Sequence, residues 1–288
     1  MNDLIKKMLP SPLPETSGSM VVALREVMQS VALLGLWRAR FFSDTAFYGG
    51  TALRILYGLN RFSEDLDFSL LKPELGFDFS RFKNALENEF KAFGFDVRFE
   101  TRPKTTRRVI ESAFLKTNTY QQMVILDTPE ELLEGIHHQA VLKIKLEIDT
   151  NPPTGFDTEM KYVFSPLQFA VRSYNLPSLF AGKLHAVLCR KWKNRVKGRD
   201  WYDFAWYVSN YPKVNIHHLE QRMRESGHYD LSTPLTKSKV IELIENAIDH
   251  LDVKMAREEV LPFVADKRVL EIWSKEFFRA ATEKIIFE

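Results

Sequence analysis

The chain lacks features that would place it among secreted, disulfide-bonded or membrane proteins. Its 288 residues include one cysteine, Cys189, which excludes an internal disulfide and a metal site built from several cysteines. The most apolar run, Val31–Trp37, is too short to cross a bilayer, and residues 1–14 have no apolar segment typical of a secretory signal. We therefore expect a soluble, cytoplasmic protein that does not associate with membranes.

An excess of charge of one sign is also missing. The formal net charge is only +2, so the overall charge does not favour nucleic-acid binding, and any basic surface must be local. The sequence contains no internal repeat and no low-complexity segment. Apolar residues make up 45% of the chain, which is enough for a packed core in one large domain or two smaller ones.

Hydrophobic periodicity predicts an α+β fold, with a mixed β-sheet followed by a helical half. In the first half, helical spacing covers residues 19–40, 51–57 and 78–93, and strand-like segments cover residues 46–48, 65–70, 96–101, 109–116, 122–126 and 141–149. After Pro177 the pattern becomes helical, over residues 178–192, 200–210, 216–225, 237–253 and 267–285. We place the α/β domain at residues 1–165 and the helical domain at residues 166–288.

Two neighbouring motifs carry the strongest chemical signal. Gly49 and Gly50 open a short helix, where backbone N–H groups can approach a phosphate. The strand over residues 65–70 then places Asp65 and Asp67 on one face, while alternate apolar residues fix the other face in the core. Each motif alone is weak, because a tight turn or a solvated strand face explains it. Together they predict a nucleotide site with a divalent metal ion.

A third carboxylate is expected, because two metal ions and a nucleophile need more ligands than one pair of aspartates supplies. The strand over residues 141–149 places Lys143, Lys145, Glu147 and Asp149 on one face. We prefer Glu147 as the third metal ligand, with Asp149 in reserve, since the sequence does not fix strand register. An exposed strand edge with ion pairs is the alternative interpretation of this face.

The helical half adds charged residues in unusual places. Lys183 lies within the apolar stripe of its helix, which favours contact with an anion such as phosphate, although a lysine reaching past the edge of the stripe is the alternative. Asp200 is a plausible N-cap of the next helix. Asp203 lies among aromatic residues, where it would orient Lys183 or the nucleotide.

Basic residues connect these two helices, and they offer two interpretations. A run of charges is usually a solvated surface, but beside an active site it can hold a polynucleotide backbone, with Trp192 available for stacking. The run comprises Arg190, Lys191, Lys193, Arg195, Lys197 and Arg199. A weaker basic cluster comprises Lys104, Arg107 and Arg108. We assign no role to His137-His138, and we expect Cys189 to be a packed thiol.

These motifs, in this order, resemble the AbiEii/AbiGii nucleotidyltransferase toxins of bacterial type IV toxin–antitoxin and abortive-infection systems. The segments that carry the resemblance are residues 49–54, 61–68, 145–148, 183–186 and 198–203. The resemblance implies a polymerase-β-like nucleotidyltransferase core and Mg²⁺-dependent transfer of a nucleotide from an NTP, often to the 3′ end of tRNA or to a protein. Mn²⁺ is a possible substitute for Mg²⁺. It also implies a separately encoded antitoxin as a partner.

From the resemblance and the motifs together we expect three overlapping groups of site residues. The metal ligands are Asp65, Asp67 and Glu147. The catalytic residues are these three with Lys183 and Asp203. The nucleotide-binding residues are Gly49, Gly50, Thr51, Arg61, Ser63, Lys145 and Asp200, with the Thr51 hydroxyl taking the place of the family's serine.

Two other classes of protein have to be weighed against this enzyme. A non-catalytic module that binds NTP or RNA could use the same scaffold, but the intact carboxylates argue against lost catalysis. A sugar-nucleotide glycosyltransferase also uses an Asp-x-Asp motif with a metal ion. It would need several parallel strands before that motif, and only one short strand precedes Asp65.

Overall fold

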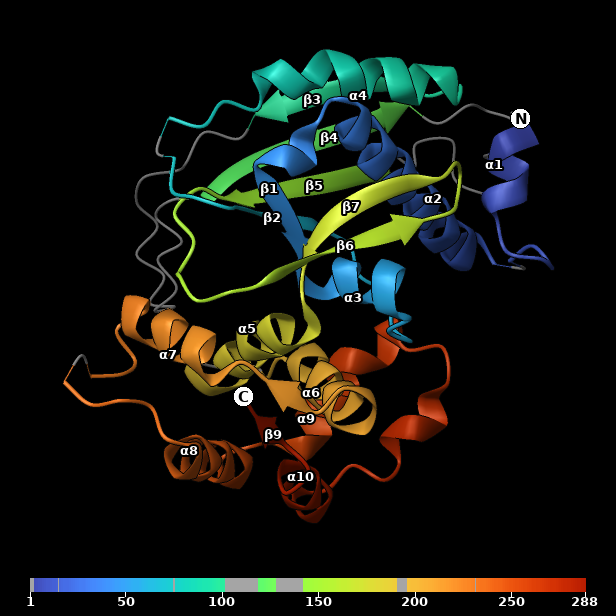
Figure 1. Cartoon of the computed structure of the whole chain (residues 1–288). Coiled ribbons are helices and arrows are strands. Elements are labelled where there is room, and N and C mark those ends of the chain that lie inside the picture. The colour runs from blue at the N-terminus through green and yellow to red at the C-terminus, as the bar shows by residue number, and fades with distance from the viewer. Residues whose placement is uncertain are drawn as a thin grey trace.

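A computed structural model describes residues 3–14, 16–74, 76–101, 119–127, 142–190, 196–230 and 232–288. Within these ranges the first half of the chain forms a seven-stranded mixed sheet, in the order β3-β4-β5-β2-β1-β7-β6. Helices pack on the sheet, and a second group of helices lies beyond one end of it (Figure 1). The mixed sheet and the helical second half confirm the predicted fold class.

The centre of the sheet joins segments that are far apart in the sequence. Strand β2 pairs antiparallel with β1 and parallel with β5, and β1 pairs parallel with β7. The strands are β1 (Thr45–Tyr48), β2 (Leu66–Leu70), β3 (Asp96–Thr101), β4 (Thr119–Asp127), β5 (Leu142–Asp149), β6 (Thr158–Val163) and β7 (Phe169–Tyr174). Since parallel neighbours need a long crossover, the site residues on β2 and β5 meet only in the folded protein.

One face of the sheet is buried by two long helices, α2 (Ser17–Arg38) and α4 (Ser80–Ala92). Leu66, Phe68 and Ile148 point into this core and are fully buried. Burying each such side chain contributes about 1.5–3 kcal/mol, so the alternation of β2 fixes which face its aspartates occupy. The remaining helices of this half are α1 (Asp3–Met8) and α3 (Gly49–Tyr57).

Helix α2 is long and apolar enough to cross a membrane, yet it is a core helix in this structure. Its 18-residue apolar window is 61% buried, and the helix packs against the sheet and α4. Thr16 and Ser19 form a capping box that satisfies backbone N–H groups at its start. Length and composition alone are therefore weak evidence for a membrane span here.

The helical half has its own apolar core, centred on α5 (Leu176–Cys189) and α6 (Gly198–Asn210). Around them lie α7 (Ile216–Glu225), α8 (Lys237–Asp249), α9 (Val253–Val260) and α10 (Lys275–Thr282). Two short strands, β8 (Lys213–Val214) and β9 (Ile286–Phe287), pair in parallel. The sheet of the first half extends to Tyr174, past the boundary expected at residue 165.

Several elements differ from the sequence-based prediction. Strands β6 and β7 were not predicted, and in β6 only Val163 is buried, so this strand has no clear apolar alternation. The helix expected over residues 237–253 ends at Asp249, and Asp252 caps α9 as a separate helix. Only α10 is an α-helix within residues 267–285, where Ser274 caps its start. The strand expected over residues 109–116 lies outside the described residues.

Candidate active site

Three carboxylates meet where β2 and β5 run side by side. Asp67 is the register partner of Glu147, and Asp65 immediately precedes β2. All three line one cleft, as the alternation of the two strands predicted. Asp149 pairs in register with Ser69 and does not line the cleft; one of its carboxylate oxygens accepts a hydrogen bond from the Asn151 N–H. The register therefore favours Glu147 over Asp149 as the neighbour of the two aspartates.

Lys145 neutralises part of this negative charge. Its ammonium forms an ion pair with Glu147 and lies 3.9 Å from an Asp65 carboxylate oxygen. Burial acts to lower the pKa of Lys145, but the hydrogen bond and charge of Glu147 outweigh it, and the pKa is raised. Burial raises the pKa of Asp65, opposed by Lys145 and reinforced by Glu147. Three carboxylates in one cleft supply only oxygen ligands, a donor set that fits a hard divalent cation such as Mg²⁺.

The glycine turn lies directly against these carboxylates. Gly49 has φ +81°, and a Cβ at this position would overlap the Asp67 carboxylate. A Cβ on Gly50 would lie 2.8 Å from Arg61 Nη2 and 2.9 Å from Ser63 Oγ. Glycine is required at position 49 by both the backbone conformation and the close approach, and at position 50 by the close approach alone. The first N–H groups of α3, which has no side-chain N-cap, are thereby held beside the acidic cluster.

Thr51 has a different position from the one expected of a phosphate-binding hydroxyl. It is fully buried, and its hydroxyl donates a hydrogen bond to the Asp65 backbone carbonyl. Thr51 is not among the residues that line the cleft. Its contact instead fixes the backbone that presents Asp65.

Behind the cleft, a buried network of charges joins the two halves of the molecule. The Arg61 guanidinium donates to both carboxylate oxygens of Asp203, over 2.5 and 2.6 Å, and the two side chains are 4% and 0% exposed. The Lys183 ammonium lies 2.7 Å from Asp203 and 2.8 Å from Asp200. Arg190 adds a contact of 3.1 Å to Asp200.

The cations in this network decide the protonation of its carboxylates. Burial acts to raise the pKa of Asp203, but the charges of Arg61 and Lys183 outweigh it, and the pKa is lowered. Burial likewise acts against ionisation of Asp200, and the charges of Lys183 and Arg190 hold its pKa far below the usual range. Both carboxylates are therefore charged at neutral pH.

This network gives several predicted site residues a definite place. Lys183 can lie on a buried helix face because its ammonium forms ion pairs with Asp200 and Asp203. Its burial therefore does not by itself require a phosphate. Arg61 is held by Asp203, although its guanidinium also borders the cleft beneath Gly50. The prediction that Asp200 is an N-cap was wrong: Lys197 precedes α6, and Asp200 lies inside the first turn, where it binds Lys183.

The cleft encloses about 520 Å³ between the sheet and the helical half. Its walls include Gly49, Gly50, Ser63 and Lys183, together with a basic group of Arg190, Lys197, Arg199 and Arg222. Arg222, on α7, was not predicted, and its buried Nε has no hydrogen-bond partner in the described structure. Within the basic run, residues 191–195 lie outside the described part of the chain, as do Lys104, Arg107, Arg108 and His137-His138.

The sequence profile of the family described as "Nucleotidyl transferase AbiEii toxin, Type IV TA system" matches residues 31–282. The chain belongs to the AbiEii nucleotidyltransferase toxin family. This AbiEii protein is therefore a nucleotidyltransferase, and the match extends well beyond residues 49–203, where the motifs that carry the resemblance lie. The family's type IV toxin–antitoxin character implies a separate antitoxin as a partner.

Two solved structures are similar to this chain, and one of them has a TM-score above 0.5. A candidate nucleotidyltransferase from H. pylori superimposes with a TM-score of 0.51 at 20% sequence identity, over 94% of this chain and 95% of that chain. The protein JHP933 from Helicobacter pylori gives a TM-score of 0.47 at 16% identity, over 91% and 90% of the two chains. Among curated proteins, none matches the chain. The first comparison supports the fold alone.

Proposed function

We propose that this AbiEii protein transfers a nucleoside monophosphate from an NTP to an RNA acceptor, most simply the 3′ end of a tRNA, in a Mg²⁺-dependent reaction inside the cell. The observation that carries the proposal is the register of β2 and β5, which places Asp67 beside Glu147 in a cleft that also holds Asp65 and the glycine turn. A protein acceptor is the alternative outcome of the same chemistry.

Asp65, Asp67 and Glu147 are the residues that would hold the metal ion. When bound, Mg²⁺ would orient the triphosphate and neutralise charge on the pyrophosphate leaving group. Lys145, which now binds Glu147, would be free to move to a phosphate oxygen when the ion takes its place. The reaction forms a bond between the acceptor oxygen and the α-phosphorus, and breaks the bond from that phosphorus to pyrophosphate.

The triphosphate would lie between the glycine turn and Lys183. Backbone N–H groups at the start of α3 supply donors for phosphate oxygens, and the helix terminus favours negative charge. An ammonium group has three N–H donors. Asp200 and Asp203 accept from Lys183, which leaves its third donor for a phosphate at the cleft wall. In this proposal Arg61 and Asp203 position Lys183 rather than contact the nucleotide.

The basic side of the cleft supports a polynucleotide acceptor. Arg190, Lys197 and Arg199 line the cleft at the start of α6 and the end of α5. Although the chain has a net charge of only +2, these cations gather at one place, which suits contact with several phosphates of an RNA strand. An antitoxin could silence the enzyme by covering the same basic wall.

The proposal is tested by incubating the protein with each NTP, labelled at the α-phosphate, together with Mg²⁺ and total tRNA. We expect label in RNA with at least one NTP, and loss of labelling with Asp67→Asn or when Mg²⁺ is chelated. Asp149→Asn is the matched control, because it changes a carboxylate on the neighbouring strand β5 that does not line the cleft. Equal labelling by Asp67→Asn and the wild-type protein would refute the assignment. Label in protein instead of RNA would show that the acceptor is a protein.

A further inference from the structure

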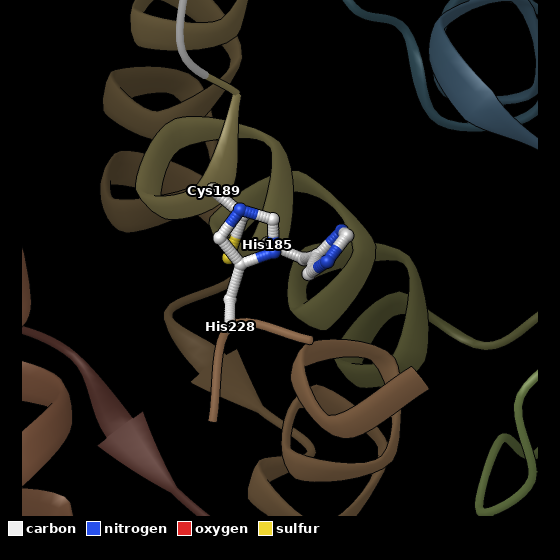
Figure 2. Close-up of side chains that lie close together, drawn as sticks. All are labelled: His185, Cys189 and His228. Carbon is white, nitrogen blue, oxygen red and sulfur yellow. The ribbon is translucent and has the colours of Figure 1, made fainter. Parts of the chain in front are cut away.

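A second cluster of metal-binding side chains lies in the helical half, apart from the three carboxylates. His185 and Cys189 are one turn apart on α5, and His228 follows α7. One potential ligand atom from each lies within 4.8 Å of the other two. Figure 2 shows the two imidazoles and the thiol gathered between the helix and the segment after α7. We propose that His185, Cys189 and His228 form a binding site for a thiophilic divalent cation such as Zn²⁺.

The arrangement suits such an ion in both ligand type and geometry. Thiolate and imidazole are the ligands that Zn²⁺ prefers, whereas Mg²⁺ prefers oxygen. A tetrahedral Zn²⁺ site with bonds of about 2.0–2.3 Å places its ligand atoms about 3.3–3.6 Å apart, so the cluster has to contract by at most about 1.5 Å. Three protein ligands leave the fourth position open to water.

The two imidazoles are already directed at a common point. His185 Nε2 and His228 Nδ1 each lie 2.9 Å from the hydroxyl oxygen of Ser226. A bound cation would replace this hydroxyl as their shared partner.

Charges around the cluster act in both directions. Arg190 and Arg222 oppose a cation, but binding converts the Cys189 thiol to a thiolate and releases one proton, which adds a negative charge at the ion. Cys189 is also the last residue of α5, and the carbonyl end of a helix favours positive charge. Asp200, which accepts from Arg190, lines the same cavity as Cys189 and His228.

The ion would connect two walls of the catalytic cleft. His185 lies two residues from Lys183 and itself lines the cleft, while His228 belongs to the segment after α7, the helix that carries Arg222. Zn²⁺ would thereby fix α5 against α7, independently of any metal ion at Asp65, Asp67 and Glu147. This inference does not depend on the proposed reaction.

The experiment is a titration of the reduced, metal-free protein with Co²⁺, followed by absorption spectroscopy. Because Cys189 is the only cysteine, a thiolate-to-Co²⁺ charge-transfer band reports this site alone, and Co²⁺ held by the carboxylates gives no such band. We expect a band that saturates at one equivalent and disappears when Zn²⁺ is added. His228→Ala should weaken Co²⁺ binding at least about tenfold, since even second-shell changes cost that much.

Two matched controls separate this site from its surroundings. His250→Ala changes a histidine that lines the same cavity as Cys189 and His228 but is not in the cluster, and Asp67→Asn changes the acidic site; both should keep the band. Cys189→Ser should abolish it, and circular dichroism would show whether that variant folds. If it does not fold, Zn²⁺ protection of the wild-type thiol against alkylation decides the question. A folded, reduced wild-type protein with no charge-transfer band, or a band unchanged in His228→Ala, would overturn the proposal.

Discussion

Replacing Asp203 with asparagine should strongly destabilise the protein. The substitution keeps the shape of the side chain but leaves the Arg61 guanidinium, only 4% exposed, without a compensating charge. Breaking a buried ion pair by removing one partner costs about 3–5 kcal/mol, a large share of the roughly 5–15 kcal/mol that holds a typical protein folded. At about 2 °C or more per kcal/mol, the melting temperature should fall by about 6 °C or more.

The loss should also depend on pH. The pKa of Asp203 is lower in the folded protein than in the unfolded chain, so its contribution is complete above the unfolded value of about 3.9. It is lost as pH falls through the lower folded value. The difference in free energy of unfolding between the wild-type protein and Asp203→Asn should therefore be constant near neutral pH and shrink below about pH 4.

Urea unfolding measures this difference, with Asp266→Asn as a control. Asp266 also binds an arginine, Arg268, but on the surface, so its replacement should cost at most about 1 kcal/mol. Replacing both members of the buried pair with apolar residues, as in Arg61→Met with Asp203→Leu, should recover part of the loss, because no charge is then left unpaired. A single Asp203→Asn variant as stable as the wild-type protein would refute this account of the network.

Two other predictions concern a glycine and a buried histidine. Gly49→Ala should abolish nucleotidyl transfer, because the new Cβ overlaps the Asp67 carboxylate. The control, Gly58→Ala, has a similar φ of +77° but faces open space, so it should cost about 1–2 kcal/mol of stability and leave activity intact. Equal activity of the two variants would contradict this. Burial, reinforced by the charge of Arg222, lowers the pKa of His218 to about 3. Below about pH 6.5 the unfolded chain therefore binds a proton at this imidazole while the folded protein does not. As the pH is lowered further, the free energy of unfolding should fall by up to about 1.4 kcal/mol per pH unit. Urea unfolding of His218→Gln at several pH values should show a shallower dependence, and an unchanged one would exclude His218 as the cause.

Local pattern was enough to predict the part of the site that lies on regular strands. The alternation of residues 65–70 fixed the directions of Asp65 and Asp67, since the apolar alternate residues had to be buried. The positions of Gly49 and Gly50 followed from the turn they open. The choice between Glu147 and Asp149 needed the register of β2 with β5, which a short sequence segment does not encode.

Residues whose partners are distant in sequence were harder to interpret. Lys183 was predicted to meet an anion, and the anions that receive it in the structure are Asp200 and Asp203. The placement of Arg222 in the cleft and of His228 beside His185 depends on how α7 packs against α5, for which no local pattern exists. Isolated charged residues on amphipathic helices carry no signal of what they face.

The ion pair of Arg61 with Asp203 has a consequence for the time at which the toxin becomes active. The two residues are 142 positions apart, and Lys183 also depends on Asp203. At a synthesis rate of about 5–20 residues per second, Asp203 is added about 7–30 s after Arg61. Until then the growing chain has the strands of the sheet and the glycine turn, but the cleft is not complete. The site is therefore assembled only after most of the chain has been made, because the residues that complete the cleft come from both halves of the sequence.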